Sequence, residues 1–488
     1  MLDKRLFRIL GMAILMVLSM SAFAFATGGE VSHENLGSVL PVWSCIPFLG
    51  MLLSIAIFPL TKPEWWEHNM LKVAIFWALI FLVPFGIVFG AHMLTFQVVE
   101  MILLDYLPFI VLLFGLFVAA GGIALKGSLA GTTKTNVAIL LIGTLLASWV
   151  GTTGAAMLMI RPIIRANAWR EKKAHIIVFF IFMVANIGGC LTPVGDPPLF
   201  LGFLRGVPFF WTMKLLPVMI MNIAILMVVF IILDKRLYNR ELAAGRKPLT
   251  MEKDVVKEPL RIEGAHNFIF ILMIVGAVIL NGLLPNYAAF ADQTTGELYG
   301  LNIAGVVFPY NSIVQIAIIL LAAALSMITT KKSTREANSF TFAPIEEVAK
   351  LFIGIFLTMI PALAILKANG ASLGIHEPWQ FFWATGCLSS FLDNAPTYLV
   401  FLTTAGSIGF TDGLQTTVGI IAVKDLMAIS AGAVFMGANT YIGNAPNFMV
   451  KSIAEENKIK MPSFFGYMVW SLCILVPTFL IDTLVFFR

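Results

Sequence analysis

Two aspartates lie where their chemistry could matter, because each falls inside a long apolar stretch beside turn-forming residues. Asp196 belongs to the segment TPVGDPP (192–198), and Asp393 belongs to SSFLDNAP (389–396). A carboxylate in such surroundings is costly unless a proton, a cation or a fixed partner neutralises it. Proton and cation would then compete for one group. We expect Asp393 to be the principal exchanging acid and Asp196 the second; the alternative for both is a structural helix cap.

Neutral oxygens that could help to bind a cation lie close to both aspartates in the sequence. The amides are Asn394, Asn439 and Asn444, and the hydroxyls are Thr152, Thr153, Thr192, Thr440, Ser148, Ser389 and Ser390. The alternative for a helical hydroxyl is a bond to its own backbone, four residues earlier. The glycines Gly188, Gly189, Gly195 and Gly443 either let the backbone approach the ion or allow close helix packing. We therefore predict a site for sodium and a proton, without an organic cofactor. The six histidines and four cysteines are scattered, so zinc is not expected.

The composition places these residues in a membrane. Hydrophobic residues make up 59% of the 488 residues, charged residues 12%, and the mean hydropathy is +0.91. A soluble domain carries about 25% charged residues, so a soluble enzyme, a nucleic-acid binder and a disordered scaffold are all excluded. Because no HExxH, GxSxG or P-loop motif occurs, we do not expect an enzyme.

The apolar segments predict an all-α polytopic membrane protein. The ten predicted spans lie near 38–60, 70–93, 106–125, 175–205, 212–233, 266–285, 309–329, 350–366, 419–450 and 462–487. Residues 1–26 combine basic residues, an apolar run and small residues, which is typical of a signal peptide; an uncleaved first helix is the alternative. Asp482, near the end of the last span, could belong to a proton path.

Two further apolar segments, 136–166 and 379–406, are predicted to be re-entrant hairpins. Each has turn residues at its midpoint, GTTG (151–154) and DNAP (393–396). An arm of about 15 residues reaches roughly 22 Å, less than a hydrocarbon core of about 30 Å. With both hairpins re-entrant, 24 of the 32 Lys and Arg residues fall on one side, which is therefore predicted to be cytoplasmic. Those loops are 61–72, 126–135, 161–173, 234–263, 331–350 and 451–460.

The sequence also repeats. TPVGDPPLF (192–200) matches TYIGNAPNF (440–448) at a spacing of 248, and SWVGTTG (148–154) matches SFLDNAP (390–396) at a spacing of 242. We predict two inverted repeats, 27–233 and 264–488, joined by a cytoplasmic linker, 234–263. Each would hold a hairpin and a broken helix, 175–205 in the first repeat and 419–450 in the second. Inverted repeats with broken helices are the architecture of secondary transporters, because exposed backbone is tolerated in lipid only beside a cavity or ligand.

The segments ANIGG (185–189), TPVGD (192–196) and SSFLDNAP (389–396) resemble motifs of the ion transporter superfamily, especially its NhaD-type sodium/proton antiporters and its citrate-transporter branch. The resemblance implies a homodimer with a scaffold domain and a mobile transport domain. Dicarboxylate carriers of the superfamily have Ser-Asn-Thr at both hairpin tips, whereas this chain has GTT (151–153) and DNA (393–395).

We therefore predict sodium/proton antiport by alternating access in a bacterial-type inner membrane. The expected partners are lipid, a small ion and a second copy of the chain, and no nucleic acid. One alternative is a carrier of citrate or another carboxylate or oxyanion, which would want a buried cation such as Arg161 facing the cavity. An ion channel through the same site is the alternative of another class.

Overall fold

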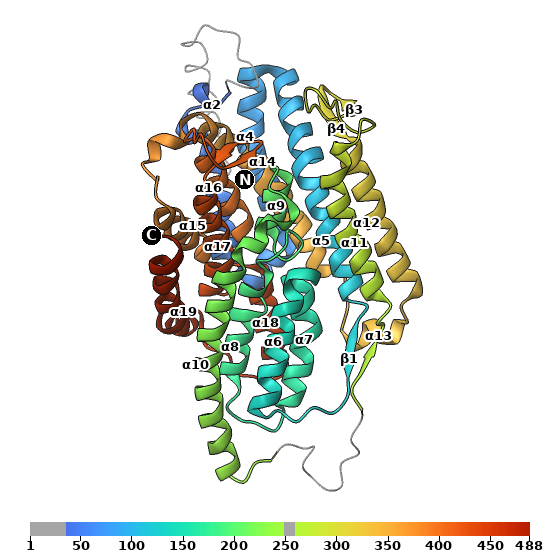
Figure 1. Ribbon diagram of the computed structural model, residues 1–488, viewed down its shortest axis with the longest axis vertical. Helices are drawn as coiled ribbons and strands as arrows, with labels where there is room; N and C mark the ends of the chain where they lie inside the picture. The colour runs from blue at the N-terminus through green and yellow to red at the C-terminus, as the bar shows by residue number, and fades with distance from the viewer. Residues whose placement is uncertain (1–35, 248–258) are drawn as a thin grey trace, which may run out of the picture.

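The protein is an elongated bundle of helices (Figure 1). This computed structural model describes residues 36–247 and 259–488, so the predicted signal peptide 1–26 and part of the linker 234–263 lie outside the described residues. Eight helical segments among the described residues are long and apolar enough to cross a membrane. They are Val42–Pro59, Pro63–Ala120, Thr133–Val150, Phe209–Ala243, Asn267–Asn286, Tyr310–Thr329, Ala343–Leu373 and Phe464–Phe486. The chain is thus a polytopic, mostly helical membrane protein, as predicted.

The first spans run together more than expected. They comprise α2 (Leu36–Val39), η2 (Val42–Cys45), α3 (Ile46–Thr61), α4 (Pro63–Glu100), the π-helix η3 (Met101–Tyr106) and α5 (Leu107–Ala120). The spans predicted near 70–93 and 106–125 are not separated by a loop. The backbone leaves helical geometry at Gly90, where φ is 85° and ψ is 162°, and η3 joins α4 to α5. Glycine adopts this conformation readily and other residues do not, so the helix changes direction there.

The first predicted hairpin consists of α6 (Thr133–Val150) and α7 (Thr152–Ala166). Gly151, with a φ of 79°, makes the turn between them. The 18 residues of α6 reach about 27 Å, which is longer than the predicted arm. The broken helix follows as α8 (Ala174–Met183), the 3-10 turn η4 (Ile187–Gly189) and α9 (Pro197–Leu204). Two prolines start α9, where their missing N–H groups cost nothing.

The second repeat has the same order of elements. Its hairpin is α15 (Pro378–Phe391) and α16 (Asn394–Gly406), and its broken helix is α17 (Val423–Met436), η9 (Gly437–Asn439) and α18 (Ala445–Glu456). Figure 1 shows the first hairpin in the lower half of the bundle and the second in the upper half. The hairpins therefore enter from opposite ends, which is the arrangement that inverted repeats require.

The remaining helices surround these elements. They are η5 (Phe209–Leu215), α10 (Leu216–Ala243), α11 (Asn267–Leu283), η7 (Leu284–Asn286), α12 (Tyr310–Thr329), α13 (Lys332–Ala337), α14 (Ala343–Asn369), η8 (Gly370–Leu373) and α19 (Phe464–Phe486). In Figure 1, the end of α10, β1 and α13 lie at the lower end of the bundle, and these segments belong to loops predicted to be cytoplasmic. Which end faces the cytoplasm stays a prediction.

Three short antiparallel strand pairs were not predicted. They pair β1 (Ala124–Lys126) with β2 (Arg261–Glu263), β3 (Gly300–Ile303) with β4 (Val306–Pro309), and β5 (Leu414–Thr416) with β6 (Gly419–Ile421). The first pair joins the segment after α5 to the segment before α11, and Lys126 binds Glu263 across it at 2.9 Å.

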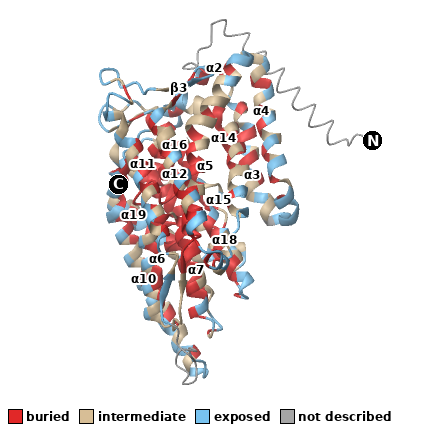
Figure 2. Ribbon diagram, turned by 90° about the vertical axis from the view of Figure 1, so that its right-hand side faces the viewer, coloured by how far each residue is buried: buried red, intermediate tan, exposed pale blue. Residues whose placement is uncertain are grey.

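The buried residues gather along the middle of the bundle (Figure 2). Most residues of the two broken helices are among them. Helix α8 is apolar on every side except for His175, and nine of its ten residues are buried. A helix that is hydrophobic all round belongs inside a protein rather than at its edge. The core thus encloses the two breaks.

Candidate functional site

The carboxylate of Asp196 lies at the centre of the bundle and is 1% exposed. Its Oδ1 accepts hydrogen bonds from Thr152 Oγ1 at 2.9 Å and from Asn444 Nδ2 at 3.2 Å, and its Oδ2 accepts one from Asn394 Nδ2 at 2.7 Å. The three donors belong to the first hairpin, the second broken helix and the second hairpin. Predicted site residues from both repeats therefore meet at one acid.

Local sequence explains why this side chain turns inward. Asp196 is the N-cap residue of α9, with φ −145° and ψ 141°, yet it makes no side-chain cap bond. Pro197 and Pro198 have no N–H to offer, and the N–H of Leu199 donates to the backbone carbonyl of Asp196. The carboxylate has no capping donor left, so it is free to bind the hairpin tips instead.

Four helices begin around this carboxylate. They are α7 at Thr152, α9 at Pro197, α16 at Asn394 and α18 at Ala445. Each helix N-terminus carries about half a positive charge from its unpaired N–H groups. Among the described residues, no Lys, Arg or His forms a hydrogen bond or ion pair with Asp196. The side chains that bind the acid directly are therefore neutral donors.

A chain of amides connects the two breaks beneath the acid. Besides Asp196, Asn444 Nδ2 lies 3.2 Å from Asn186 Oδ1 and 3.2 Å from the Ala185 carbonyl oxygen. Asn186 Nδ2 donates to Asn447 Oδ1 at 2.7 Å, and Asn447 in turn donates to backbone carbonyls of the second break. Asn186 and Asn447 are completely buried. Our sequence reasoning missed both as site residues, although an amide within an apolar segment was a usable signal.

Four predicted hydroxyls brace the hairpin tips rather than face the acid. Ser148 Oγ donates to the Gly188 carbonyl at 2.5 Å, and Ser390 Oγ donates to the Met436 carbonyl at 3.0 Å. The Thr192 hydroxyl donates to the Ser148 carbonyl, and the Thr440 hydroxyl donates to the Ser390 carbonyl. The two sets match at the spacings of 242 and 248. The repeat is thus present in individual hydrogen bonds as well as in sequence.

The glycines of the breaks allow close packing. A Cβ atom on Gly195 would lie 2.1 Å from the Gly189 carbonyl oxygen, and one on Gly443 would lie 2.6 Å from the Gly437 carbonyl oxygen. Gly188 and Gly189 are similarly confined. In this structure these glycines allow close packing of the chain, because each break folds tightly against itself or its hairpin.

Asp393 is placed differently from Asp196. It is half-buried at the tip of the second hairpin, and its Oδ1 accepts a hydrogen bond from the Ala395 N–H at 3.0 Å. The side chain therefore caps α16, which is the structural alternative considered from the sequence. The residue after it, Asn394, rather than Asp393 itself, donates to Asp196. The structure thus puts Asp196, rather than Asp393, at the centre.

The last two predicted ligands flank the tips. Asn439 Nδ2 donates to Ser390 Oγ at 2.9 Å, whereas its Oδ1 is buried without a partner among the described residues. That oxygen is available as an acceptor or ligand. Thr153 follows Thr152 in the first turn of α7 and is half-buried.

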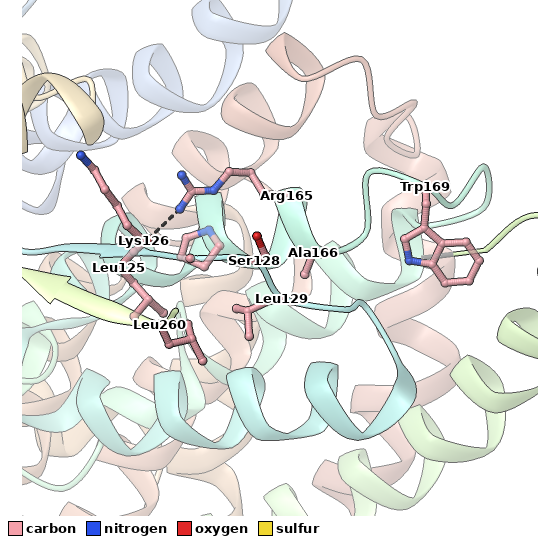
Figure 3. A pocket seen from close by; sticks show the side chains of 10 residues that line it. Leu125, Lys126, Ser128, Leu129, Arg165, Ala166, Trp169 and Leu260 are labelled. Atoms are coloured by element: carbon pink, nitrogen blue, oxygen red, sulfur yellow. Dashed lines mark hydrogen bonds between the residues drawn. The ribbon is translucent and has the colours of Figure 1, made fainter. Parts of the chain in front are cut away.

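Basic side chains lie away from the acid. Arg161 is nine positions beyond Thr152 on α7, about 13 Å along the helix. At the base of the same hairpin, a cavity of about 210 Å³ is lined by Lys126, Arg165 and Trp169, among others (Figure 3). Arg165 donates to the Leu125 carbonyl there at 2.7 Å. None of the predicted site residues lines this cavity.

Spanning helices that break at the centre of the bundle, where both repeats contribute side chains, define the architecture of a secondary transporter. Residues 37–487 match a family described as "Putative citrate transport". Because the match covers nearly the whole chain, the protein belongs to this family, which agrees with the resemblance to the ion transporter superfamily and its citrate branch. No curated protein matches the chain.

Proposed function

We propose that the protein exchanges sodium for protons by alternating access, with the Asp196 carboxylate holding either ion in turn. The observation that carries this proposal is a buried carboxylate whose two oxygens accept only neutral hydrogen bonds, from three elements of both repeats. A buried carboxylate without a fixed cation needs a mobile one, or a proton. Competition between the two for one site couples their fluxes.

The neighbours of Asp196 suit such a switch. Asn394 and Asn444 donate amide hydrogens to the carboxylate in this structure. Each side-chain amide also has an oxygen, which rotation of the amide group would present to a cation. Sodium prefers oxygen ligands, and the Thr152 hydroxyl adds another. We propose that these groups exchange the role of donor for that of ligand when the proton leaves.

Alternating access would move the hairpins and broken helices against the remaining helices. We also propose the homodimer and the bacterial-type inner membrane that the resemblance implies. Light scattering of the purified protein in detergent tests the dimer, because a monomer mass would contradict it.

A second candidate is a carrier of citrate or a related carboxylate. The family description favours it, and four helix N-termini around one point suit a negatively charged group. Without a basic side chain at Asp196, however, the substrate would need a co-bound cation or a protonated Asp196. A fixed ion channel would differ from both, because its flux would not saturate or couple to a second ion.

Reconstituted protein distinguishes these functions. Purified protein in liposomes that contain a pH-sensitive dye is given sodium, lithium, potassium or citrate in turn. We expect sodium to drive saturable proton movement in the opposite direction, and Asp196→Asn to abolish it. Arg165→Gln is the matched control, because Arg165 lies at the base of the hairpin and should leave exchange intact. Citrate uptake without sodium-driven proton movement in the parent protein would replace the antiport proposal by the carboxylate carrier.

A further inference from the structure

A second buried acid lies outside the site around Asp196. Asp482, on α19, is completely buried, as is Asn222 on α10. Asn222 Nδ2 lies 2.8 Å from Asp482 Oδ1 and 2.9 Å from Asp482 Oδ2. No other hydrogen bond or ion pair of this carboxylate is found in residues 36–247 and 259–488. Within the described residues, its direct hydrogen-bond partner is therefore one neutral amide.

The repeat supplies an internal comparison for this acid. Asp234, on α10, lies 248 residues before Asp482, which is the spacing that relates the two breaks. Asp234 is also completely buried, but Arg170 Nη1 binds its Oδ1 at 2.5 Å, and His175 Nε2 lies 2.9 Å from the same oxygen. Of two acids at matched positions, one has a fixed cation and the other has none.

A buried carboxylate without a fixed cation holds a mobile cation or a proton. Sodium requires several oxygen ligands, whereas Asp482 faces an amide nitrogen that can only donate. Asn222 Oδ1 is buried without a partner among the described residues. The same side chain thus carries an unused acceptor for the proton of a neutral carboxylic acid.

We propose that Asp482 is a second proton-binding site, positioned by Asn222 at the contact between the last helices of the two repeats. The site is separate from Asp196, which shares no described contact with either residue. Asp482 lies four residues before the end of α19. Asp482 is therefore within about 6 Å, along the helix, of the end of α19.

Among the described residues, no charged side chain forms a hydrogen bond or ion pair with Asp482. The titratable residues on the neighbouring elements are Lys214 in η5, Asp234, Lys235, Arg236, Tyr238, Arg240 and Glu241 on α10, Glu377 and Cys387 beside or on α15, Tyr467 and Cys473 on α19, and Arg488 after it. Asp234 is twelve positions from Asn222 along α10, about 18 Å. We therefore expect Asn222, which donates to both oxygens of Asp482, to be the side chain that influences its protonation most.

Infrared spectroscopy of the purified protein tests this proposal without any transport. A protonated carboxylic acid has a carbonyl band that a carboxylate lacks. We expect the spectrum of Asp482→Asn to lose one such band near neutral pH. The parent band should shift in D2O and disappear reversibly as the pH is raised within the range where the protein stays folded. Asn222→Leu should move that titration to higher pH, because it removes the donor that favours the charged form.

Asp292→Asn is the matched control. Hydrogen bonds from Thr294, first from its side chain, hold the pKa of the half-buried Asp292 below its usual value, so this variant should lose only a carboxylate band. If Asp482→Asn likewise loses only a carboxylate band, the proposal is wrong. A band in the parent protein that neither titrates nor shifts in D2O would also overturn it, because a bound proton must exchange. If the antiport proposal for Asp196 were wrong, the infrared results expected for Asp482 and Asp292 would not change.

Discussion

The two repeats share a backbone conformation at their breaks but differ in the side chain that each break supplies. The residue before the second half of each broken helix is Asp196 in one repeat and Asn444 in the other, with φ and ψ of −145° and 141° against −153° and 138°. Both side chains leave their own helix uncapped and point to the same centre. The shared geometry brings two polar side chains together, and the difference leaves one negative charge between them. Under the proposed function, this one carboxylate would hold either one sodium ion or one proton.

At the hairpin tips, it is the second repeat that has the acid and the first that has an uncharged residue. Thr152 and Asn394 occupy matched positions and both donate to Asp196. The residue before them is Gly151 in the first hairpin, with a φ of 79°, and Asp393 in the second, with a φ of −56°. The first tip needs a glycine because of its positive φ, whereas the second tolerates a side chain and uses it as a helix cap.

Exchanging the acid and the amide between the repeats should have the largest effect. We expect Asp196→Asn to lose sodium-driven proton movement entirely, and the double variant Asp196→Asn with Asn444→Asp to stay inactive. Asn444 faces the acceptors Asn186 Oδ1 and the Ala185 carbonyl, which would repel a carboxylate at this position. The measurement is dye quenching in proteoliposomes with matched protein content. Recovery in the double variant would break the comparison, because it would make the two positions equivalent.

Removing the two matched donors should have a smaller, graded effect. Thr152→Val and Asn394→Leu each delete one hydrogen bond that favours the charged form of Asp196. A hydrogen bond to a charged group contributes about 1.5–3 kcal/mol, which corresponds to a shift of roughly one to two pH units. The proton should bind more tightly in both variants, so the pH profile of antiport should move to higher pH.

The control for this pair is Thr404→Val, because the Thr404 hydroxyl bonds the Val400 carbonyl of its own helix. It should leave the pH profile in place. If only one of the two tip variants shifts the profile, the hairpins do not share the acid equally. If the pH profile is unchanged in both variants, the group that titrates during antiport is not Asp196.

The sequence predicted the breaks and the hairpins because glycines, prolines and turn residues interrupt apolar runs, and few backbones other than broken helices allow that inside a membrane. It also predicted that Thr152, Asn394, Asn444 and Asp196 share one site, since the repeat order brings the tips to the breaks. The role of each in ion binding stays a prediction. The strand pairs were missed because strands of three or four residues have no detectable periodicity.

Some features could not be predicted, because they depend on side-chain orientation. Which aspartate is central depends on whether the cap bond forms, and this is decided by the two prolines after Asp196 and the free N–H of Ala395 after Asp393. Asn186 and Asn447 have no counterparts at the repeat spacing, where Val434 and Leu199 stand. The partner of Asp482 lies 260 residues away, and no motif announces it.

The smallest effect is expected at Asp393, which we expected from the sequence to be the principal acid and whose side chain caps α16 in the structure. If its carboxylate only caps α16, Asn serves nearly as well, because Asp and Asn rank together as N-caps. Asp393→Asn should then keep most of the antiport and lose little thermal stability, whereas Asp393→Ala should cost about 1 kcal/mol of unfolding free energy. Reconstituted flux and thermal unfolding measure both. A flux as low as that of Asp196→Asn, in a protein as stable as the parent, would show that the second tip carries an exchanging acid. Each repeat would then contribute one exchanging acid. The repeats would differ in the hydrogen-bond donors around that acid and not in the number of acids.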